Sequence, residues 1–403
     1  MSDAAPGSSV IDRYLELGLR LGRHVDGFVD AYYGPPALAA RVEAEPVTAP
    51  ERLVADAAGL LVDLDAGVDA TGVDPSRRRW VRAQVVGLHT SARKLAGEPI
   101  GYADEVEWCY GVRPTFRDED AFAGAHLRLD EALPGSGPIG ERVIAWREAQ
   151  AIPVEKLEPV LRSLAEDFRE RTERLFGLPD GEHVEWELAH DQPWSGFNYY
   201  LGDLRSRVAI NTDLPVLSTS IAHLVAHEAY PGHHTEHSRK EAGLVRHRGW
   251  EEETIFLVGT PQCLLAEGLA DLALEVVAGE GPEQVVAGHL RPFGIHYDPE
   301  VVAAVRVASE SLDAVRANAA WLLHADGVPA DDVVAYVERW GLLPRARAAK
   351  AVEFLTSDTW RAYISCYVEG LPLCRAYVRD DPSRFATLLT EQLVPADLAA
   401  AAA

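Results

Sequence analysis

Apolar residues recur every three to four positions along most of the chain, a spacing typical of amphipathic helices. The first such segment begins at the capping-box pattern Ser9-x-x-Asp12 and keeps its spacing as far as Val29. Thr48-x-x-Glu51 repeats the cap pattern ahead of a second helix. Further helices are predicted over residues 80–95, 155–176, 218–229, 261–278, 300–325, 329–340, 347–356 and 358–369. The pattern therefore predicts a mainly α fold.

Alternating apolar and polar residues are confined to one part of the chain. They occur at Val184, Trp186 and Leu188, and again within Ser206–Asn211. An aromatic, glycine-bearing segment, Trp194–Gly202, lies between them. Period-two alternation favours strands with one buried face. We expect a small antiparallel sheet here, next to a histidine-rich helix.

Neither an internal repeat nor a convincing linker interrupts the sequence. We therefore expect residues 1–403 to form a single unit, divided into a helical N-terminal lobe (1–180) and a lobe that carries the histidine-rich region (181–395). The tail, residues 396–403, is nearly all alanine, and we expect it to be frayed.

The net charge of the chain limits the classes of binding partner that we expect. The 403 residues contain 38 basic and 63 acidic side chains, giving a formal net charge of −25. So acidic a surface repels phosphate backbones and anionic lipids, which argues against nucleic-acid and membrane partners. The chain lacks an apolar run of about 18 residues and a signal-peptide pattern at its start. Its four scattered cysteines form no disulfide framework, so we expect a cytoplasmic protein.

Five of the 14 histidines gather in one segment whose core reads HEAYPGHH. In the zinc motif HExxH, two histidines one helical turn apart bind the metal and the glutamate acts as general base. Here His227-Glu228 begins the motif, but Pro231 stands where the second histidine belongs. Proline ends the helical hydrogen bonding, and Gly232 permits a backbone path closed to other residues. This pair could bring His233 back toward His227.

Two other interpretations of the segment remain open. A match to half of HExxH also arises by chance, in a helix that simply ends in Pro-Gly before surface histidines. His223, four residues before His227, lies on the same helix face and is a rival ligand. Its plainer role is a hydrogen bond at the edge of the core.

The helix predicted over 261–278 carries Glu267, Asp271 and Glu275 at intervals of four residues, which places them on one stripe. Such a stripe is ordinarily a solvated face. A zinc site with two histidines commonly takes a glutamate as its third ligand, however. With the histidine motif upstream, Glu267 becomes the candidate ligand and Asp271 a residue that orients a ligand histidine. Gly268, inside this helix, predicts close packing.

HEAYPGHH, followed by AEGLADLALE, resembles the bacterial domain-of-unknown-function family 885, whose hallmark is HExxPGH with a later EGxA segment. That family resembles helical gluzincin peptidases of the thermostable carboxypeptidase and angiotensin-converting-enzyme type. The resemblance runs from about residue 194 to Gly370. It implies a large helical gluzincin-like fold and a zinc ion (Zn²⁺), with His227, His233 and Glu267 as ligands and Glu228 as base. His234 lies outside the core motif.

Two later segments extend the resemblance. Arg316-x7-His324 is similar to the family's R-x3-D-x-G-x-H segment, but alanine and leucine replace its aspartate and glycine. SCYVEG, which contains Tyr367, is similar to its Tyr-x-x-Gly segment. The resemblance implies that His324 and Tyr367 stabilise the oxyanion. In the plainer interpretation His324 caps a helix, and Tyr363 and Tyr367 are core aromatics one turn apart.

These inferences predict a zinc-dependent hydrolase of peptide bonds. Arg316 lies on one helix face with His324 and could bind a substrate carboxylate, which favours a carboxypeptidase-like enzyme acting on short peptides. The Ser206–Asn211 strand could offer its edge to an extended peptide. One alternative is a metal-dependent hydrolase of small non-peptide amides. Another is a non-catalytic helical binding protein with a degenerate motif. The sequence leaves the peptide specificity, native metal and oligomeric state open.

Overall fold

The computed structural model describes residues 9–67, 71–192, 194–357 and 360–402. Helices dominate the described chain and two small sheets complete it, so the predicted mainly α fold is confirmed. None of the described helices combines the length and apolar character that a bilayer crossing needs. The division into lobes at residue 180 stays a prediction.

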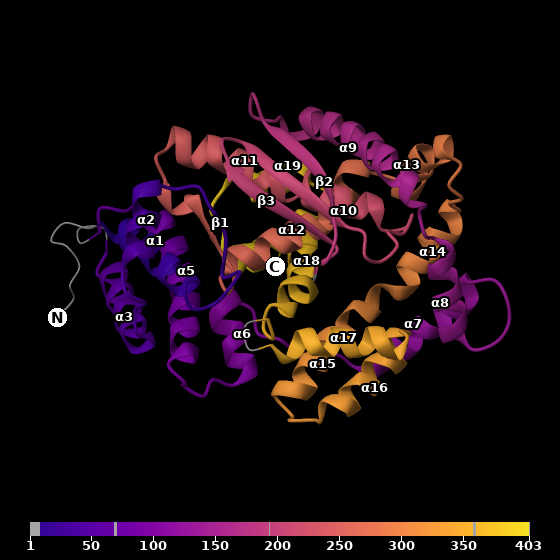
Figure 1. The fold of residues 1–403 in the computed structure, drawn as a ribbon, viewed down its shortest axis with the longest axis horizontal. Helices are drawn as coiled ribbons and strands as arrows, with labels where there is room; N and C mark the ends of the chain where they lie inside the picture. Colours follow the sequence, from indigo (N-terminus) through magenta and orange to yellow (C-terminus); the bar gives the residue numbers. More distant parts are fainter. Residues whose placement is uncertain (1–8, 68–70, 193, 358–359, 403) are drawn as a thin grey trace.

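A helical bundle forms the N-terminal end of the molecule, drawn in indigo and purple in Figure 1. Its helices are α1 (Val10–Gly22), α2 (Pro36–Ala44), α3 (Pro50–Asp65), α5 (Pro75–Leu95) and α6 (Tyr102–Tyr110). The predicted capping box at Ser9 and Asp12 is confirmed, since each side chain accepts a hydrogen bond from the other's backbone N–H. The second predicted cap is wrong, because α3 begins after Ala49 without a side-chain cap.

The first predicted helix also ends earlier than its apolar spacing indicates. The chain leaves the helix at Gly22, and residues Val29–Tyr32 form β1, which pairs antiparallel with β5 (Ile255–Leu257). Gly27 adopts a φ of 74°, which glycine accommodates without strain. Pairing with a strand more than 200 residues later overrides the local helical pattern.

The predicted small sheet consists of β2 (His183–Ala189), β3 (Gly196–Gly202) and β4 (Arg205–Asn211), in the order β2-β4-β3. β3 and β4 pair antiparallel, but β2 and β4 are parallel. The expectation that Ser206–Asn211 offers a free edge is therefore wrong, because β4 is the central strand. The neighbouring β3 lies at an edge of this sheet.

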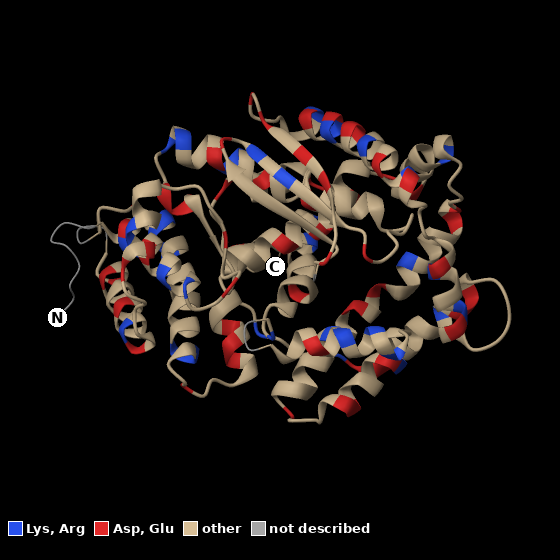
Figure 2. Ribbon diagram, viewed as in Figure 1, with Lys and Arg blue, Asp and Glu red and all other residues tan. Residues whose placement is uncertain are grey.

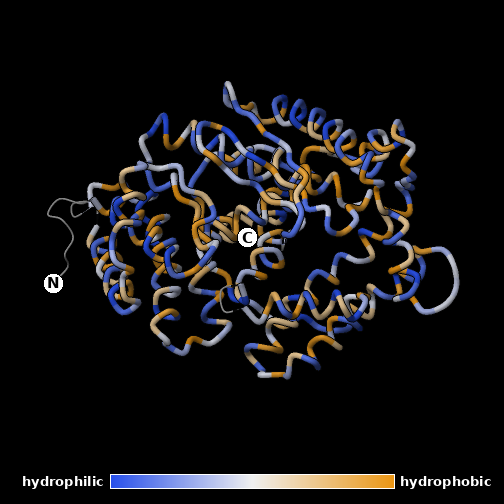
Figure 3. Tube along the Cα trace, viewed as in Figure 1, coloured by the Kyte–Doolittle hydropathy of each residue, from blue (hydrophilic) through white to orange (hydrophobic). Residues whose placement is uncertain are grey.

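Four helices surround the histidine-rich region: α10 (Ile221–Glu228), α11 (His233–Lys240), α12 (Pro261–Ala278) and α18 (Ile364–Val378). α12 runs through the centre of the molecule (Figure 1), where Figure 3 shows mostly hydrophobic residues. It contributes Leu264 and Leu269 to one hydrophobic core and Ala273 and Val277 to another. The carboxylate of Glu267 on this helix is thereby held in a fixed, buried position.

The remaining α-helices lie on both sides of α12 in Figure 1 and complete the described fold. They are α7 (Glu119–Ala132), α8 (Ile139–Ala149), α9 (Val154–Phe176), α13 (Pro282–Leu290), α14 (Pro299–Ser309), α15 (Val315–His324), α16 (Ala330–Gly341), α17 (Arg345–Thr356), α19 (Pro382–Thr390) and α20 (Pro395–Ala402). The helix predicted over 300–325 is split by a 3-10 turn at residues 310–314. Figure 2 shows charged residues of both signs spread over these outer helices.

The expectation of a frayed tail is wrong for the described residues, which end in α20. Alanine has the highest helix propensity, and Leu398 is fully buried. An ion pair between Arg79 and Asp397 ties the helix to α5. Local composition and tertiary contacts therefore act together to order this segment.

Candidate metal centre

The break between α10 and α11 sets the geometry of the two central histidines. α10 ends at Glu228 and α11 begins at His233. Gly232 is the residue that makes the close return feasible, because a Cβ there would lie 1.9 Å from the carbonyl oxygen of His227. The rings of His227 and His233 consequently meet, with 3.2 Å between their Nε2 atoms.

Glu267 on α12 completes the group. Its Oε2 lies 3.5 Å from His227 Nε2, and its Oε1 lies 3.8 Å from His233 Nε2. Ligands at about 2.1 Å around one tetrahedral zinc ion are about 3.4 Å apart, close to these separations. Oε2 is also buried without a hydrogen-bond partner. Two imidazoles and a carboxylate arranged in this way fit a zinc ion.

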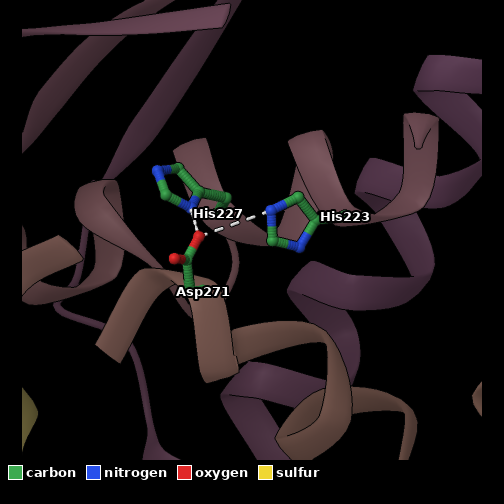
Figure 4. Close-up of side chains that lie close together, drawn as sticks. All are labelled: His223, His227 and Asp271. Atoms are coloured by element: carbon green, nitrogen blue, oxygen red, sulfur yellow. Dashed lines mark ion pairs between the residues drawn. The ribbon is translucent and has the colours of Figure 1, made fainter. Parts of the chain in front are cut away.

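Asp271, one turn after Glu267, contacts the opposite nitrogen of His227. Its Oδ1 lies 3.0 Å from His227 Nδ1 and 3.5 Å from His223 Nε2, and Figure 4 shows this carboxylate between the two rings. Burial alone would raise the pKa of Asp271, but contacts from His223 and His227 lower it below its usual range. An ionised Asp271 favours a proton on Nδ1, which leaves the Nε2 lone pair free for a metal.

Two further histidines lie near this group: His223, the rival ligand, and His234, which follows His233 in the sequence. His223, His227 and Asp271 form a second group of potential donors, but this group uses the nitrogen of His227 that faces Asp271. Both ring nitrogens of His234 are engaged elsewhere, Nδ1 with Ser206 and Nε2 with Glu182, each at 2.8 Å. His234 therefore anchors α11 to the sheet instead of facing the candidate centre.

Burial governs the protonation of the remaining ionisable groups. Glu228 is buried, which raises its pKa to about 7; His227 opposes this shift, and the carboxylates of Glu267 and Asp271 add to it. Burial lowers the pKa of His233 to about 4, so its imidazole is neutral at pH 7. A neutral imidazole and a carboxyl that titrates near neutrality are what a metal ligand and a general base require.

The edge strand β3 holds Glu228 in place. Asn198 donates a hydrogen bond of 2.6 Å to the backbone oxygen of Glu228. At Gly196 the strand approaches so closely that a Cβ would lie 3.0 Å from Glu228 Oε1. The candidate base therefore lies at the C-terminal end of α10, against the edge strand β3.

Tyr363, for which the sequence suggested only a place among the core aromatics, lies beside the candidate ligands. Its hydroxyl donates to Glu267 Oε1 at 2.7 Å. The hydroxyl of Tyr367 lies 3.4 Å from that of Tyr363, which places Tyr367 beside the same group. The signal for Tyr363 was its position one helical turn before Tyr367.

α12 and α18 approach each other closely, because Gly268 and Gly370 face each other without side chains between them. This contact confirms the close packing predicted at Gly268.

Arg316 lies near Tyr367, whereas His324 contacts residues away from the candidate ligands. The guanidinium carbon of Arg316 lies 6.0 Å from the ring centroid of Tyr367. His324 shares a 2.7 Å hydrogen bond between Nε2 and the carbonyl oxygen of Leu355, and its ring packs against Tyr102. These contacts favour the structural alternative for His324. Its oxyanion role stays a prediction that they do not support.

Comparisons with known proteins show the fold but no family. The chain matches no protein-family model, and no curated protein is significantly similar to it in sequence. A solved protein from Colwellia psychrerythraea, provisionally described as a lipoprotein, is similar over 88% of this chain and 69% of its own, with 15% identity and a TM-score of 0.52. This similarity shows a shared fold.

Two further solved structures are similar at lower scores. One, provisionally described as a lipoprotein of unknown function from Shewanella oneidensis, covers 90% of this chain and 74% of its own, with 12% identity and a TM-score of 0.49. The other is the M32 carboxypeptidase from Deinococcus radiodurans R1, which covers 98% of this chain and 94% of its own, with 13% identity and a TM-score of 0.40.

Proposed function

We propose that this protein is a zinc-dependent hydrolase of peptide bonds, with carboxypeptidase-like activity on short peptides. The observation that carries the proposal is the convergence of His227, His233 and Glu267 beside the buried carboxyl of Glu228. We expect the enzyme to act in the cytoplasm, without a nucleic-acid or membrane partner, in keeping with its net charge of −25.

His227, His233 and Glu267 would hold the zinc ion. When bound, zinc polarises a scissile carbonyl and lowers the pKa of water to about 7. Glu228, whose own pKa lies near 7 in the metal-free chain, would accept the proton of the attacking water and return it to the leaving amine. Tyr367 would donate a hydrogen bond to the developing oxyanion, while Tyr363 fixes the carboxylate of Glu267.

The edge of β3 is the place where an extended substrate would lie. Backbone groups of a peptide can pair with an edge strand, and β3 passes Glu228 at Gly196. Arg316, next to Tyr367, is one cationic side chain near the candidate centre that a substrate carboxylate could meet. Together these features favour short peptides with a free C-terminus.

Metal analysis and one substitution test the proposal. Protein purified without added metal should contain about one zinc per chain, and His233→Ala should lose it, whereas His247→Ala, at an exposed histidine, should retain it. Glu228→Gln should retain zinc but lose turnover of short peptides, because an amide cannot accept the proton.

Other outcomes would contradict the proposal. Absence of zinc from the wild-type protein would favour a non-catalytic binding protein. Turnover of small non-peptide amides without any turnover of peptides would favour the other hydrolase. Loss of zinc from Glu228→Gln would make Glu228 a ligand.

A further inference from the structure

A cavity of about 320 Å³ lies beside the candidate metal centre, within the range typical of ligand sites. Its lining comes from α8, α10, α12, α13 and α14. At one end it is bounded by His223 and Asp271, the two residues in contact with each other next to His227 (Figure 4). None of the three candidate ligands lines it, so the cavity borders the candidate centre through His223 and Asp271.

Much of the wall is apolar. Aliphatic and aromatic side chains line the cavity, among them Leu217, Leu274, Val286, Tyr297, Val302 and Val305. Such a wall stabilises an apolar group by roughly 25 cal/mol for each Å² removed from water. The volume of the cavity and its apolar lining therefore fit a branched or aromatic side chain of a ligand.

Charged groups in the lining are paired, with one exception. Arg306 pairs with Glu283 at 2.7 Å, and Glu275 pairs with Arg375 at 2.5 Å. Arg147 has no carboxylate partner among the described residues; it donates one hydrogen bond, of 3.2 Å, to the carbonyl oxygen of Leu342. Burial and the nearby Arg347 lower the pKa of Arg147, and the charge of Asp313 opposes this shift only in part. A partly buried guanidinium that lines a cavity and forms no ion pair favours an anionic ligand.

We propose that this cavity binds the C-terminal residue of the substrate, with the apolar side chain against the wall and the α-carboxylate on Arg147. The inference rests on the proposed function and names its substrate class: peptides that end in an apolar residue with a free carboxylate. The residue after the scissile bond would extend past Asp271 into the cavity. Arg316, which does not line the cavity, is the competing anchor for the carboxylate.

Binding of a compound without a peptide bond tests the cavity independently of catalysis. The probe is 3-phenylpropanoate, and its neutral partner is 3-phenylpropan-1-ol; both are titrated calorimetrically into the zinc-loaded protein. Arg147→Ala should weaken binding of the carboxylate about 10- to 100-fold and leave the alcohol unchanged. Arg345→Ala, which removes an exposed arginine of α17 outside the cavity, should change neither.

Two further variants keep the test decisive. Arg147→Lys retains the charge without the fork of donors and should restore part of the carboxylate binding, even if Arg147→Ala folds poorly. Val302→Trp should fill the cavity and weaken both probes. A loss of carboxylate binding that follows Arg316→Ala instead of Arg147→Ala would overturn the assignment, as would equal loss of acid and alcohol in Arg147→Ala.

Peptides and N-acyl amino acids share the proposed carboxylate chemistry, so kinetics separate them. With glycyl-phenylalanine, Arg147→Ala should raise KM about 10- to 100-fold with little change in kcat, and should spare glycyl-phenylalaninamide. Turnover of N-acetylphenylalanine without turnover of the dipeptide would overturn the peptide assignment. If no compound is hydrolysed, yet binding of 3-phenylpropanoate depends on Arg147, the proposed function fails while the cavity assignment stands.

Discussion

Glu267 joins the two halves of the candidate centre. One of its oxygens faces the imidazole of His227, and the other accepts a hydrogen bond from the hydroxyl of Tyr363. Burial would raise the pKa of Glu267, but His227 and His233 lower it, so the carboxyl is ionised. A carboxylate fixed in this way by a hydrogen bond needs little reorganisation to bind a metal.

The two tyrosines should therefore differ in their effects. Tyr363→Phe removes the hydrogen bond to Glu267 and should weaken zinc binding about 10- to 100-fold. Tyr367→Phe should leave zinc content unchanged and lower kcat about 10²- to 10³-fold, because it removes a donor to the oxyanion. Competition with a chelator and steady-state kinetics measure the two effects. Equal zinc loss in both variants would contradict this division of roles.

At the residue scale, spacing and chemistry in the sequence anticipated some of the contacts that the structure shows, whereas the roles of these residues stay predictions. Asp271 was expected to orient a ligand histidine, and it contacts His227 Nδ1 at 3.0 Å. Tyr363 was not assigned to the site, since two aromatics one turn apart are equally typical of a core. The contact between the ring of His324 and α17 could not be foreseen from a motif match, and the oxyanion role of His324 stays a prediction.

At the scale of elements, the link between α10 and α11 determines the site. As the sequence indicated, Pro231 and Gly232 lie in the break between the two helices, and the ring of His233 returns to that of His227. The pairing of strands was less predictable. β1 and β5 are more than 200 residues apart, and the parallel arrangement of β2 and β4 depends on a crossover that alternation does not reveal. A local pattern fixes which residues share a face, but not which strand they meet.

Gly232→Ala tests this link. The added Cβ would lie 1.9 Å from the carbonyl oxygen of His227, so the backbone must shift and the two histidines must separate. We expect zinc to be lost and the free energy of unfolding to fall by about 1–3 kcal/mol. Gly243→Ala is the matched control, because nothing lies within 4 Å of its added Cβ. Urea unfolding and zinc analysis provide the measurements; a Gly232→Ala variant with full zinc content would show that the link is not constrained.

At the scale of the whole molecule, a buried polar junction connects segments from both ends of the chain. The turn at residues 251–254 supplies Glu252, which pairs with Arg77 of α5, and Glu253, which accepts a hydrogen bond of 2.8 Å from Gln392. Lys240 of α11 lies close enough to Glu253 to influence its charge. One group of charged and polar side chains thus joins three parts of the molecule. These are the N-terminal bundle, the helices of the candidate metal centre and the C-terminal segment.

The junction should make stability depend on pH. Burial raises the pKa of Glu253 to about 7, against the opposing effects of Lys240 and Gln392, whereas an unfolded glutamate has a pKa of 4.5. The folded state therefore binds this proton more tightly, and the contribution of Glu253 to stability is lost as pH rises from about 4.5 through about 7. Over that window the loss reaches up to about 3 kcal/mol.

Glu253→Gln removes this titration while it keeps an amide that can hydrogen bond. Relative to wild type, the variant should gain up to about 3 kcal/mol between pH 5 and pH 8, because only the wild-type protein must bury a charge at the higher pH. Urea unfolding at both pH values measures the change, with Glu251→Gln, at an exposed neighbour, as the control for substitution alone. A constant difference between variant and wild type across this range would mean that Lys240 compensates the charge of Glu253 fully, and that the junction holds the segments together as an ion pair instead of a neutral acid.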